Sequence, residues 1–244
     1  TEDAYVTYKS KYMESVWWLL SEIHKKDLLY KGYTVQPYSP KAGTGLSSHE
    51  LNQPGCYREV KDVSATALFK IIPSEKSLSL FGSSIVHFMA WTTTPWTLPS
   101  NTALTIGEKI KYSRISTFNP YTKEPQEVII ASDLIFHYFR IEDENISDLP
   151  EGKVLPWEKL SEHLGKSFVG LRYDPLLPYA EPYENSKNAF KIISGDFVTT
   201  SDGTGIVHTA PTFGADDARV AKEFGVPPML VLDSSGNPVP LVDL

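Results

Sequence analysis

The sequence predicts a mixed α/β domain, built around a closed or distorted β-barrel with flanking helices. Many short runs of β-branched and aromatic residues are separated by turn residues, and only a few helical segments lie between them. The chain has 244 residues, enough for one sizeable domain or two small ones. Its composition of 41% apolar and 22% charged residues is ordinary for a globular protein.

The N-terminal segment is expected to form a helix from Tyr5 to Lys26, because its apolar residues recur at helical spacing. Gly32 then ends this segment. Trp17 and Trp18 are adjacent, so one of them must leave the main apolar face. Residues 33 to 57 are rich in Gly, Pro, Ser and Asn and are expected to form loops and turns.

Runs of strand-forming residues predict most of the remaining elements. The expected strands are Thr66–Ile72, Ile85–Trp91, Thr102–Ile106, Lys111–Phe118, Val128–Ala131, Phe190–Ser194, Phe197–Thr200, Ile206–Thr209 and Met229–Leu232.

Short helices are expected between these strands. One spans Leu134 to Phe139, with Ser132-Asp133 as its N-cap. A second spans Pro156 to Leu164 and stops at Gly165. A third spans Asp216 to Phe224.

The net charge of −7, from 30 acidic and 23 basic residues, argues against a freestanding, non-specific nucleic-acid binder. The isolated chain should therefore bind RNA weakly. No apolar run approaches the roughly 18 residues that would span a bilayer, and no signal peptide is visible, so we expect a cytoplasmic protein without a membrane partner. A start at Thr1 without Met, and an end at Leu244, suggest a piece of a larger protein.

Cys56 is the single cysteine, so it cannot form an internal disulfide. It has no Cys or His at metal-ligand spacing, and we expect no metal site. A small, partly buried loop residue is favoured over a nucleophile.

The segment from Trp91 to Asn101 concentrates hydroxyls, an amide and two indoles. Its two prolines make it a poor central strand. It is therefore either the lining of a pocket for a ligand with polar and apolar parts, or a Thr-rich edge strand that ends in a turn.

A second segment, Gly203 to Pro211 followed by Gly214 to Asp217, lies about a hundred residues later. These two segments closely resemble the catalytic segments of the editing domain of isoleucyl-tRNA synthetases, in the same order. The valyl and leucyl enzymes carry an Arg-Pro-Glu or Arg-Pro-Asp type of sequence in place of Thr94-Pro95-Trp96. The resemblance therefore indicates the isoleucyl branch, and it implies the same barrel architecture.

Hydrolysis of an aminoacyl ester needs a placed water, donors for the oxyanion and an anchor for the substrate ammonium. By resemblance, Asp217 is the anchor and Asp216 a partner of the helix dipole. From spacing alone, both would be acidic residues that favour the first turn of a helix. His208 is either a hydrogen-bonded core residue or, as the resemblance implies, a catalytic-site residue that positions a water or the ribose hydroxyl.

The threonines cannot all touch one ligand, because successive side chains of an extended segment point opposite ways. We expect Thr93 to make the closest catalytic contact. Thr92 or Thr94 then orients water or the terminal adenosine, and Asn101 resembles a family position that shapes the same pocket. Trp96 supplies an apolar wall, and an aromatic residue from the loop Phe190 to Phe197 is a candidate for stacking on adenine.

The resemblance implies that residues 1–32 are a lead-in helix from a synthetic domain and that residues 33–244 are the editing domain. The implied function is hydrolysis of valine mischarged onto tRNA(Ile), with valyl-adenylate as a second substrate that the residues leave open. Its partners are the 3′ end of that tRNA and the rest of the synthetase chain. Editing needs no cofactor, whereas the parent ligase uses ATP and Mg²⁺. The ligase signatures, of His-x-Gly-His and Lys-Met-Ser-Lys-Ser type, are absent here.

Two other hypotheses stay open. One is a non-catalytic module that clasps the acceptor end of tRNA, which the acidic net charge disfavours. The other is an unrelated small-molecule hydrolase, for which the sequence supplies neither a G-x-S-x-G motif nor a metal cluster.

Overall fold

The computed structural model describes residues 6–30, 34–144, 155–182, 184–229 and 235. The chain separates into two compact units, residues 1–36 and 37–244. The assignment of the first unit to a synthetic domain stays a prediction.

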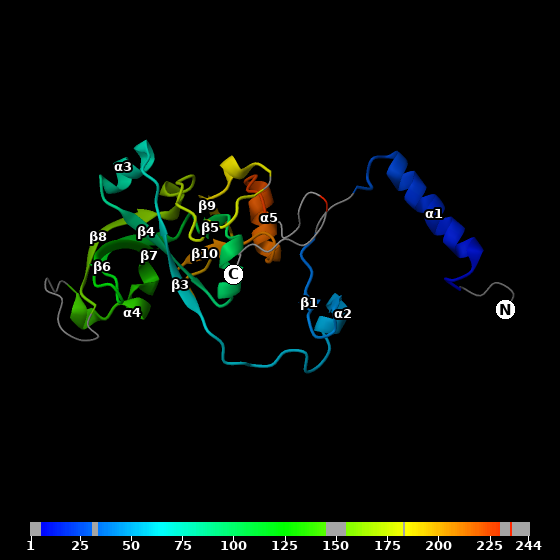
Figure 1. The fold of residues 1–244 in the computed structure, drawn as a ribbon, viewed down its shortest axis with the longest axis horizontal. Coiled ribbons are helices and arrows are strands. Elements are labelled where there is room, and N and C mark those ends of the chain that lie inside the picture. The colour runs from blue at the N-terminus through cyan, green and yellow to red at the C-terminus, as the bar shows by residue number, and fades with distance from the viewer. Residues whose placement is uncertain (1–5, 31–33, 145–154, 183, 230–234, 236–244) are drawn as a thin grey trace. The chain divides into compact units, whose positions relative to one another are not determined.

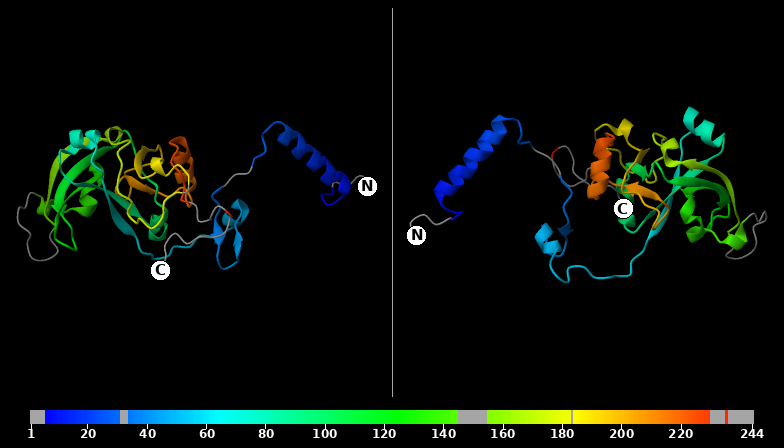
Figure 2. Two further views of the ribbon diagram at one scale, coloured as in Figure 1. Left: turned by 45° about the horizontal axis from the view of Figure 1, so that its top comes forward. Right: turned by 180° about the vertical axis from the view of Figure 1, so that it is seen from behind.

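The larger unit is organised by one mixed, eight-stranded sheet, in the order β8-β6-β7-β4-β10-β5-β9, with β3 paired to β4 (Figure 1). Its strands are β3 (Ala65–Lys70), β4 (Val86–Thr92), β5 (Ala103–Ile106), β6 (Lys111–Phe118), β7 (Pro125–Ala131), β8 (Trp157–Leu164), β9 (Lys191–Ser194) and β10 (Ile206–Thr209). The sheet curls into a half-barrel, and helices flank it (Figure 2). The predicted fold class is confirmed.

The sheet forks at β4. One edge of β4 pairs with β3 along its whole length, in antiparallel register. The other edge pairs in parallel with β7 at Val86–Phe88 and in parallel with β10 at Trp91, opposite Val207. The segment that leads into β10 therefore enters just beyond the end of β7, where Ala131 N donates to Thr204 O at 2.9 Å.

Large aromatic side chains fill the core between the branches of this sheet. Phe88 and Phe168 pack edge to face with ring centroids 5.1 Å apart, and Phe69 packs on Tyr173 at 5.3 Å. All four side chains are fully buried. Burial of a large aromatic side chain contributes about 3 kcal/mol or more to stability, so these contacts fix how the two branches lie.

The helices of this unit are short. They are α2 (Ser48–Leu51), α3 (Glu75–Phe81), α4 (Ile135–Tyr138) and α5 (Ala215–Glu223), with 3₁₀ turns η1 (Pro95–Ser100), η2 (Ser132–Leu134), η3 (Ile141–Asp143), η4 (Gly165–Ser167) and η5 (Ser186–Asn188). The expected loop at residues 33–57 also contains a small antiparallel pair, β1 (Tyr38–Ser39) and β2 (Thr44–Gly45).

The predicted helix Pro156–Leu164 is wrong, because Trp157–Leu164 forms strand β8 on the edge of the sheet. Its apolar residues are spaced as in a helix, but β6 offers an unpaired edge along its whole length. A bulge between Arg114 and Ile115 takes up the extra residue Leu160, which is 42% exposed. Tertiary pairing outweighs the local periodicity here.

Other expectations also fail, and one helix was missed. Phe197–Thr200 is not a strand but a turn and irregular segment after β9. Ser132 does not cap a helix, because its hydroxyl bonds Ser113 and Glu162 instead. Helix α3 was not predicted, although Ser74 and Ser77 form a capping box at its start. Met229 is not in a strand, and residues 230–232 lie outside the described residues.

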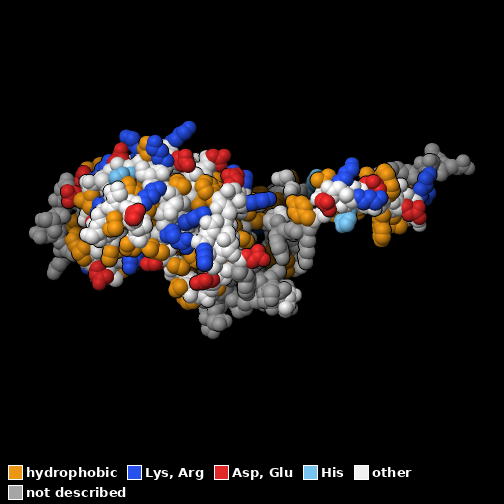
Figure 3. Space-filling model, turned by 90° about the horizontal axis from the view of Figure 1, so that it is seen from above, with side chains coloured by type: hydrophobic (Ala, Val, Ile, Leu, Met, Phe, Trp, Pro, Cys, Tyr) orange, Lys and Arg blue, Asp and Glu red, His pale blue; other side chains and the backbone are white. Residues whose placement is uncertain are grey.

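Acidic, basic and apolar side chains are interspersed on the face drawn in Figure 3. Within the strand pair β6–β7, Glu127 accepts from Arg114 Nε at 2.6 Å. Among the described residues, no helix is both long and apolar enough to cross a membrane.

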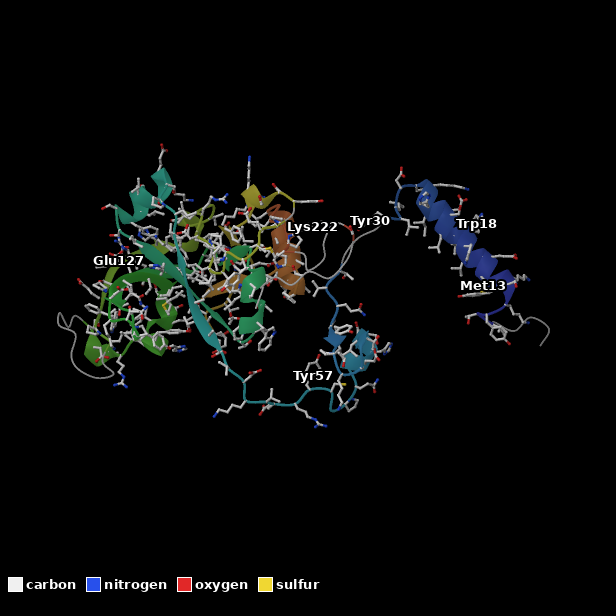
Figure 4. All side chains as sticks on the ribbon, viewed as in Figure 1. Met13, Trp18, Tyr30, Tyr57, Glu127 and Lys222 are labelled. Atoms are coloured by element: carbon white, nitrogen blue, oxygen red, sulfur yellow. The ribbon has the colours of Figure 1, made fainter. Side chains whose placement is uncertain are left out.

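The smaller unit contains helix α1 (Ser10–Lys25), which begins later than predicted. None of its residues is buried. Trp17 and Trp18 are 75% and 63% exposed, so neither indole is buried among the residues that the structure describes. Figure 4 shows Met13 and Trp18 projecting from this helix.

The fork at β4 generates a stability prediction. Gly205 has φ +72°, and a Cβ there would lie 2.4 Å from the Cβ of Ala131. Gly170 has a similar φ of +88° but open space around it. We expect Gly170→Ala to cost about 1–2 kcal/mol of unfolding free energy for the left-handed backbone, and Gly205→Ala to cost a further ~1–3 kcal/mol for the clash. Urea unfolding of both variants measures the difference. Equal losses of unfolding free energy would contradict the close approach of Gly205 to Ala131.

Candidate functional site

A cavity of about 570 Å³ opens where the two motif segments meet. Hydroxyl, aromatic, carboxylate and imidazole groups share its wall. Its lining includes Trp91, Thr92, Thr93, Thr94, Trp96, Thr97, Phe197, Thr199, Asp202, Gly203, Thr204, Gly205, Ile206, Val207, His208, Ala210, Phe213, Gly214 and Asp217. A wall of this mixed kind suits a ligand with both polar and apolar parts.

The strand directions explain why these residues converge. Strands β4 and β10 are parallel, so their carboxyl ends emerge at the same edge of the sheet. The Thr-rich segment continues from β4 there, and the loop to α5 continues from β10. Strand β5 is antiparallel to β10, with Leu104 opposite His208, so the residues that precede β5 come to this edge as well. Carboxyl ends of parallel strands are common ligand sites for this geometric reason.

His208 is a buried side chain that lines the cavity, and both of its ring nitrogens are hydrogen-bonded. Its Nδ1 lies 2.8 Å from Asn101 Nδ2, and its Nε2 lies 3.1 Å from Thr97 Oγ1. Asn101 does not line the cavity but stands behind the imidazole. These contacts join residues that are more than 100 positions apart in the chain.

The partners of Asn101 determine which imidazole nitrogen carries the proton. Asn101 Nδ2 also bonds the carbonyl oxygen of Ala103 at 2.8 Å, and a carbonyl only accepts. The amide nitrogen therefore faces both Ala103 and His208, and its second proton is donated to Nδ1. An accepting Nδ1 leaves the proton of a neutral imidazole on Nε2, which donates to Thr97. Thr97 in turn donates to Thr94 O at 2.8 Å.

Burial lowers the pKa of His208 from 6.5 to about 4. The donor aimed at Nδ1 acts in the same direction, because a hydrogen bond to the neutral form disfavours protonation. His208 is therefore neutral near pH 7, and both its nitrogens are occupied. This arrangement favours a positioning role over proton transfer.

The threonines divide into bonded and available hydroxyls. Thr92 Oγ1 lies 3.3 Å from Thr94 Oγ1 and accepts from Thr94 N at 3.1 Å. Thr94 Oγ1 also lies 3.3 Å from Thr97 Oγ1. Thr93 is exposed on the cavity wall, and its hydroxyl has no hydrogen-bond partner among the residues that the structure describes. Thr93 is thus the hydroxyl that is open to a ligand.

Asp217 reaches the cavity from the first turn of α5. Its Oδ2 accepts from Ala210 N at 2.8 Å. Burial raises the pKa of this carboxyl, the bond from Ala210 lowers it, and neighbouring Asp216 raises it. A Cβ on Gly214 would lie 2.8 Å from the Asp217 carboxylate, so the small residue there leaves room for it. Asp216, by contrast, pairs on the surface with Arg219 at 3.7 Å.

The other side chains expected near the wall lie in different places. Trp96 and Trp91 both line the cavity, although Trp96 is 63% exposed. Of the aromatic residues expected to stack, Phe197 lines the cavity, whereas Phe190 is buried in the core. Cys56 is exposed rather than partly buried and lies outside the cavity.

Two residues of this network were not predicted. Thr97 lies inside the segment from Trp91 to Asn101, directly after Trp96. Its place in that hydroxyl-rich segment was the signal that could have identified it. Tyr173 donates its hydroxyl proton to Asn101 Oδ1 at 2.6 Å from a distant segment, and no spacing in the sequence indicated that contact.

Comparison with known proteins identifies the family of the chain. The chain belongs to the family of class I tRNA synthetases (I, L, M and V), whose model matches residues 1–213.

Its relatives within this family include three bacterial proteins, each an isoleucine–tRNA ligase. The protein of Porphyromonas gingivalis is 53% identical over 100% of this chain, and that of Cytophaga hutchinsonii is 54% identical over 99%. The protein of Clostridium tetani is 41% identical over 99% of the chain. The chain spans about a fifth of the length of each, 20–21%.

Solved structures that it resembles include leucyl-tRNA synthetase editing domains. That of P. knowlesi has a TM-score of 0.49 and 14% identity, over 71% of this chain and 73% of that one. That of P. falciparum has a TM-score of 0.43 and 16% identity, over 66% and 65%.

The depressed pKa of His208 predicts a pH-dependent stability. In the unfolded chain this imidazole becomes protonated as the pH falls below 6.5. In the folded chain it becomes protonated only near pH 4, because its pKa is lowered. The contribution of His208 to stability is therefore complete above pH 6.5 and falls by about 3 kcal/mol as the pH drops to 4. Urea unfolding of the parent and His208→Gln at pH 7, 5.5 and 4 measures this loss. If the difference in unfolding free energy between the parent and His208→Gln is the same at all three pH values, the prediction is wrong.

Proposed function

We propose that the cavity is an editing site, which hydrolyses valine wrongly esterified to tRNA(Ile). The observation that carries this proposal is the half-buried Asp217 carboxylate, which lines the same cavity as the open Thr93 hydroxyl and the neutral His208. Membership of the class I synthetase family and the isoleucine–tRNA ligase relatives support it.

Asp217 would anchor the α-ammonium group of the esterified amino acid. Burial penalises its ionised form, and an adjacent cation relieves that penalty. Its Oδ2 is held by Ala210 N, which orients the carboxylate before the substrate arrives. A charge-assisted hydrogen bond in such a site contributes about 1.5–3 kcal/mol.

The reaction itself needs no covalent intermediate. A water oxygen would bond to the ester carbonyl carbon, and the bond from that carbon to the ribose oxygen would then break. The ribose oxygen receives a proton that the attacking water loses. Thr93 supplies a free hydroxyl to orient the water or the oxyanion. His208 bonds Thr97, which in turn contacts Thr94, and so holds these threonines in place.

Selection between valine and isoleucine would be steric. One methylene is worth about 1–3 kcal/mol in an apolar pocket, roughly 10–200-fold, a general range for which isoleucyl enzymes are the usual example. A second pocket that admits valine and excludes isoleucine adds discrimination. The aromatic side chains of Trp91, Trp96 and Phe213 are candidates for the limiting wall.

The acidic chain would depend on other parts of a synthetase to deliver the tRNA. Its net charge of −7 gives little attraction for phosphates. We therefore propose the rest of the synthetase as its partner in the cytoplasm, with the mischarged 3′ end as substrate and valyl-adenylate as a second candidate. The proposed hydrolysis uses no cofactor.

The first test is substrate selectivity. At high enzyme concentration, we expect this chain to deacylate valyl-tRNA(Ile) at least tenfold faster than isoleucyl-tRNA(Ile), because the extra methylene is excluded. Release of labelled amino acid measures both rates. If neither ester is hydrolysed, by the chain alone or joined to the remainder of a synthetase, the proposal fails and a binding module becomes the better account.

The second test separates two neighbouring carboxylates. Asp217→Asn should lower kcat/KM for valyl-tRNA(Ile) by about 10–100-fold, through loss of the charge-assisted contact to the ammonium group. Asp216→Asn is the matched control, since that side chain is 70% exposed on the same helical turn. Equal effects of the two substitutions would indicate a role for helix charge instead of substrate binding.

A further inference from the structure

Tyr173 is a fully buried tyrosine whose hydroxyl lies within the hydrogen-bond network of the site but outside the cavity wall. Its hydroxyl donates to Asn101 Oδ1 at 2.6 Å. Burial raises the pKa of this phenol well above 10, so the group stays protonated and remains a donor. None of the steps proposed for hydrolysis uses it.

The ring of Tyr173 is held by the core from several directions. It packs edge to face against Phe69 at 5.3 Å and against Phe190 at 6.2 Å. Its backbone N donates to Phe190 O at 3.1 Å, and the residue forms an isolated bridge with Ile71. Phe190 itself adopts φ +57°, an uncommon conformation for a bulky residue, and donates from N to Thr102 O at 2.7 Å. Tyr173 is thus a rigid part of the core beside Asn101.

Asn101 has its full set of side-chain partners only when Tyr173 is present. Its two amide protons go to Ala103 O and His208 Nδ1, and its oxygen accepts from Tyr173. The chain of donors therefore runs from Tyr173 through Asn101 and His208 to Thr97, and each donor fixes the direction of the next. Linked buried hydrogen bonds of this kind strengthen one another.

We propose that Tyr173 is a positioning residue for this site: through Asn101, its hydroxyl holds His208 in the tautomer that carries its proton on Nε2 and donates to Thr97. The link to catalysis rests on the proposed editing function, whereas the link to the tautomer does not.

Removal of the hydroxyl should loosen this arrangement without opening the core. Tyr173→Phe keeps the ring and its aromatic contacts but leaves Asn101 Oδ1 buried without a donor. The amide then gains freedom to turn, and donation to His208 Nδ1 weakens. An imidazole without that donor can also place its proton on Nδ1 and accept from Thr97 at Nε2.

The experiment reads the tautomer of His208 and the kinetics in the same three proteins. Parent, Tyr173→Phe and Thr117→Val are labelled with ¹⁵N-histidine, and the ¹⁵N shifts of His208 are measured at pH 7. Thr117→Val is the matched control, because it removes a different buried hydroxyl, which donates to Pro156 O at 2.8 Å on the β6–β8 side. Deacylation of valyl-tRNA(Ile) is measured alongside, and backbone amide spectra verify the fold.

The expected result is a single Nε2–H tautomer in the parent and in Thr117→Val, and a mixture of tautomers in Tyr173→Phe. The kcat of Tyr173→Phe should fall about tenfold, the effect of one buried hydrogen bond, with KM within about twofold of the parent. In the unaltered chain, a hydroxyl proton of Tyr173 in slow exchange, with an Overhauser contact to the Asn101 amide, tests the same anchor even if Tyr173→Phe does not fold.

Other outcomes separate the two proposals. An unchanged tautomer in Tyr173→Phe overturns the positioning role, even if kcat falls, because a merely structural loss would give that pattern. A changed tautomer in a chain that hydrolyses neither ester supports the anchor and counts against the editing function. Absence of the Overhauser contact in the unaltered chain also overturns the positioning role.

Discussion

The parallel pairing of β4 with β10 is the constraint on which the site depends. It aligns Trp91 with Val207 and brings the carboxyl ends of both strands to one edge of the sheet. The pairing is short because β7 occupies the first half of the same edge of β4. The approach to β10 must therefore pass close to the end of β7, and Gly205 makes that passage possible. A larger residue there would push β10, and His208 with it, out of register.

Beyond this pairing, the site is organised by hydrogen bonds in series. The core tyrosine, an amide, an imidazole and a row of hydroxyls are joined in one direction, and the Ala103 carbonyl and the Tyr173 hydroxyl together orient the amide. The buried, neutral imidazole is therefore a fixed part of the cavity wall. A base at this position would need a free nitrogen, and both nitrogens are bonded. Catalysis would then arise from placement of water and substrate more than from proton transfer by His208.

Asp217 shows the opposite principle. Its burial disfavours the charged form, and a single backbone donor offsets only part of that cost. A carboxylate in such an environment destabilises the folded chain when no ligand is bound, and it favours the binding of a cation. Its neighbour Asp216 is instead exposed to solvent and pairs with Arg219. This contrast between two adjacent acids on one helical turn is why the proposed anchor is Asp217 and the proposed partner of the helix dipole is Asp216.

The sequence alone determined the fold class, most of the strands and the two segments that form the cavity, because strand propensity and dense motifs are local properties. It also identified Thr92, Thr93, Thr94, Trp96, His208 and Asp217, all of which line one cavity. The tertiary structure decided the rest. Residues 157–164 became a strand because β6 had an open edge, against a helical spacing of apolar residues. The tautomer of His208 depends on Asn101 and, through it, on Tyr173, and contacts between such distant residues are set by packing, which leaves no periodicity in the chain.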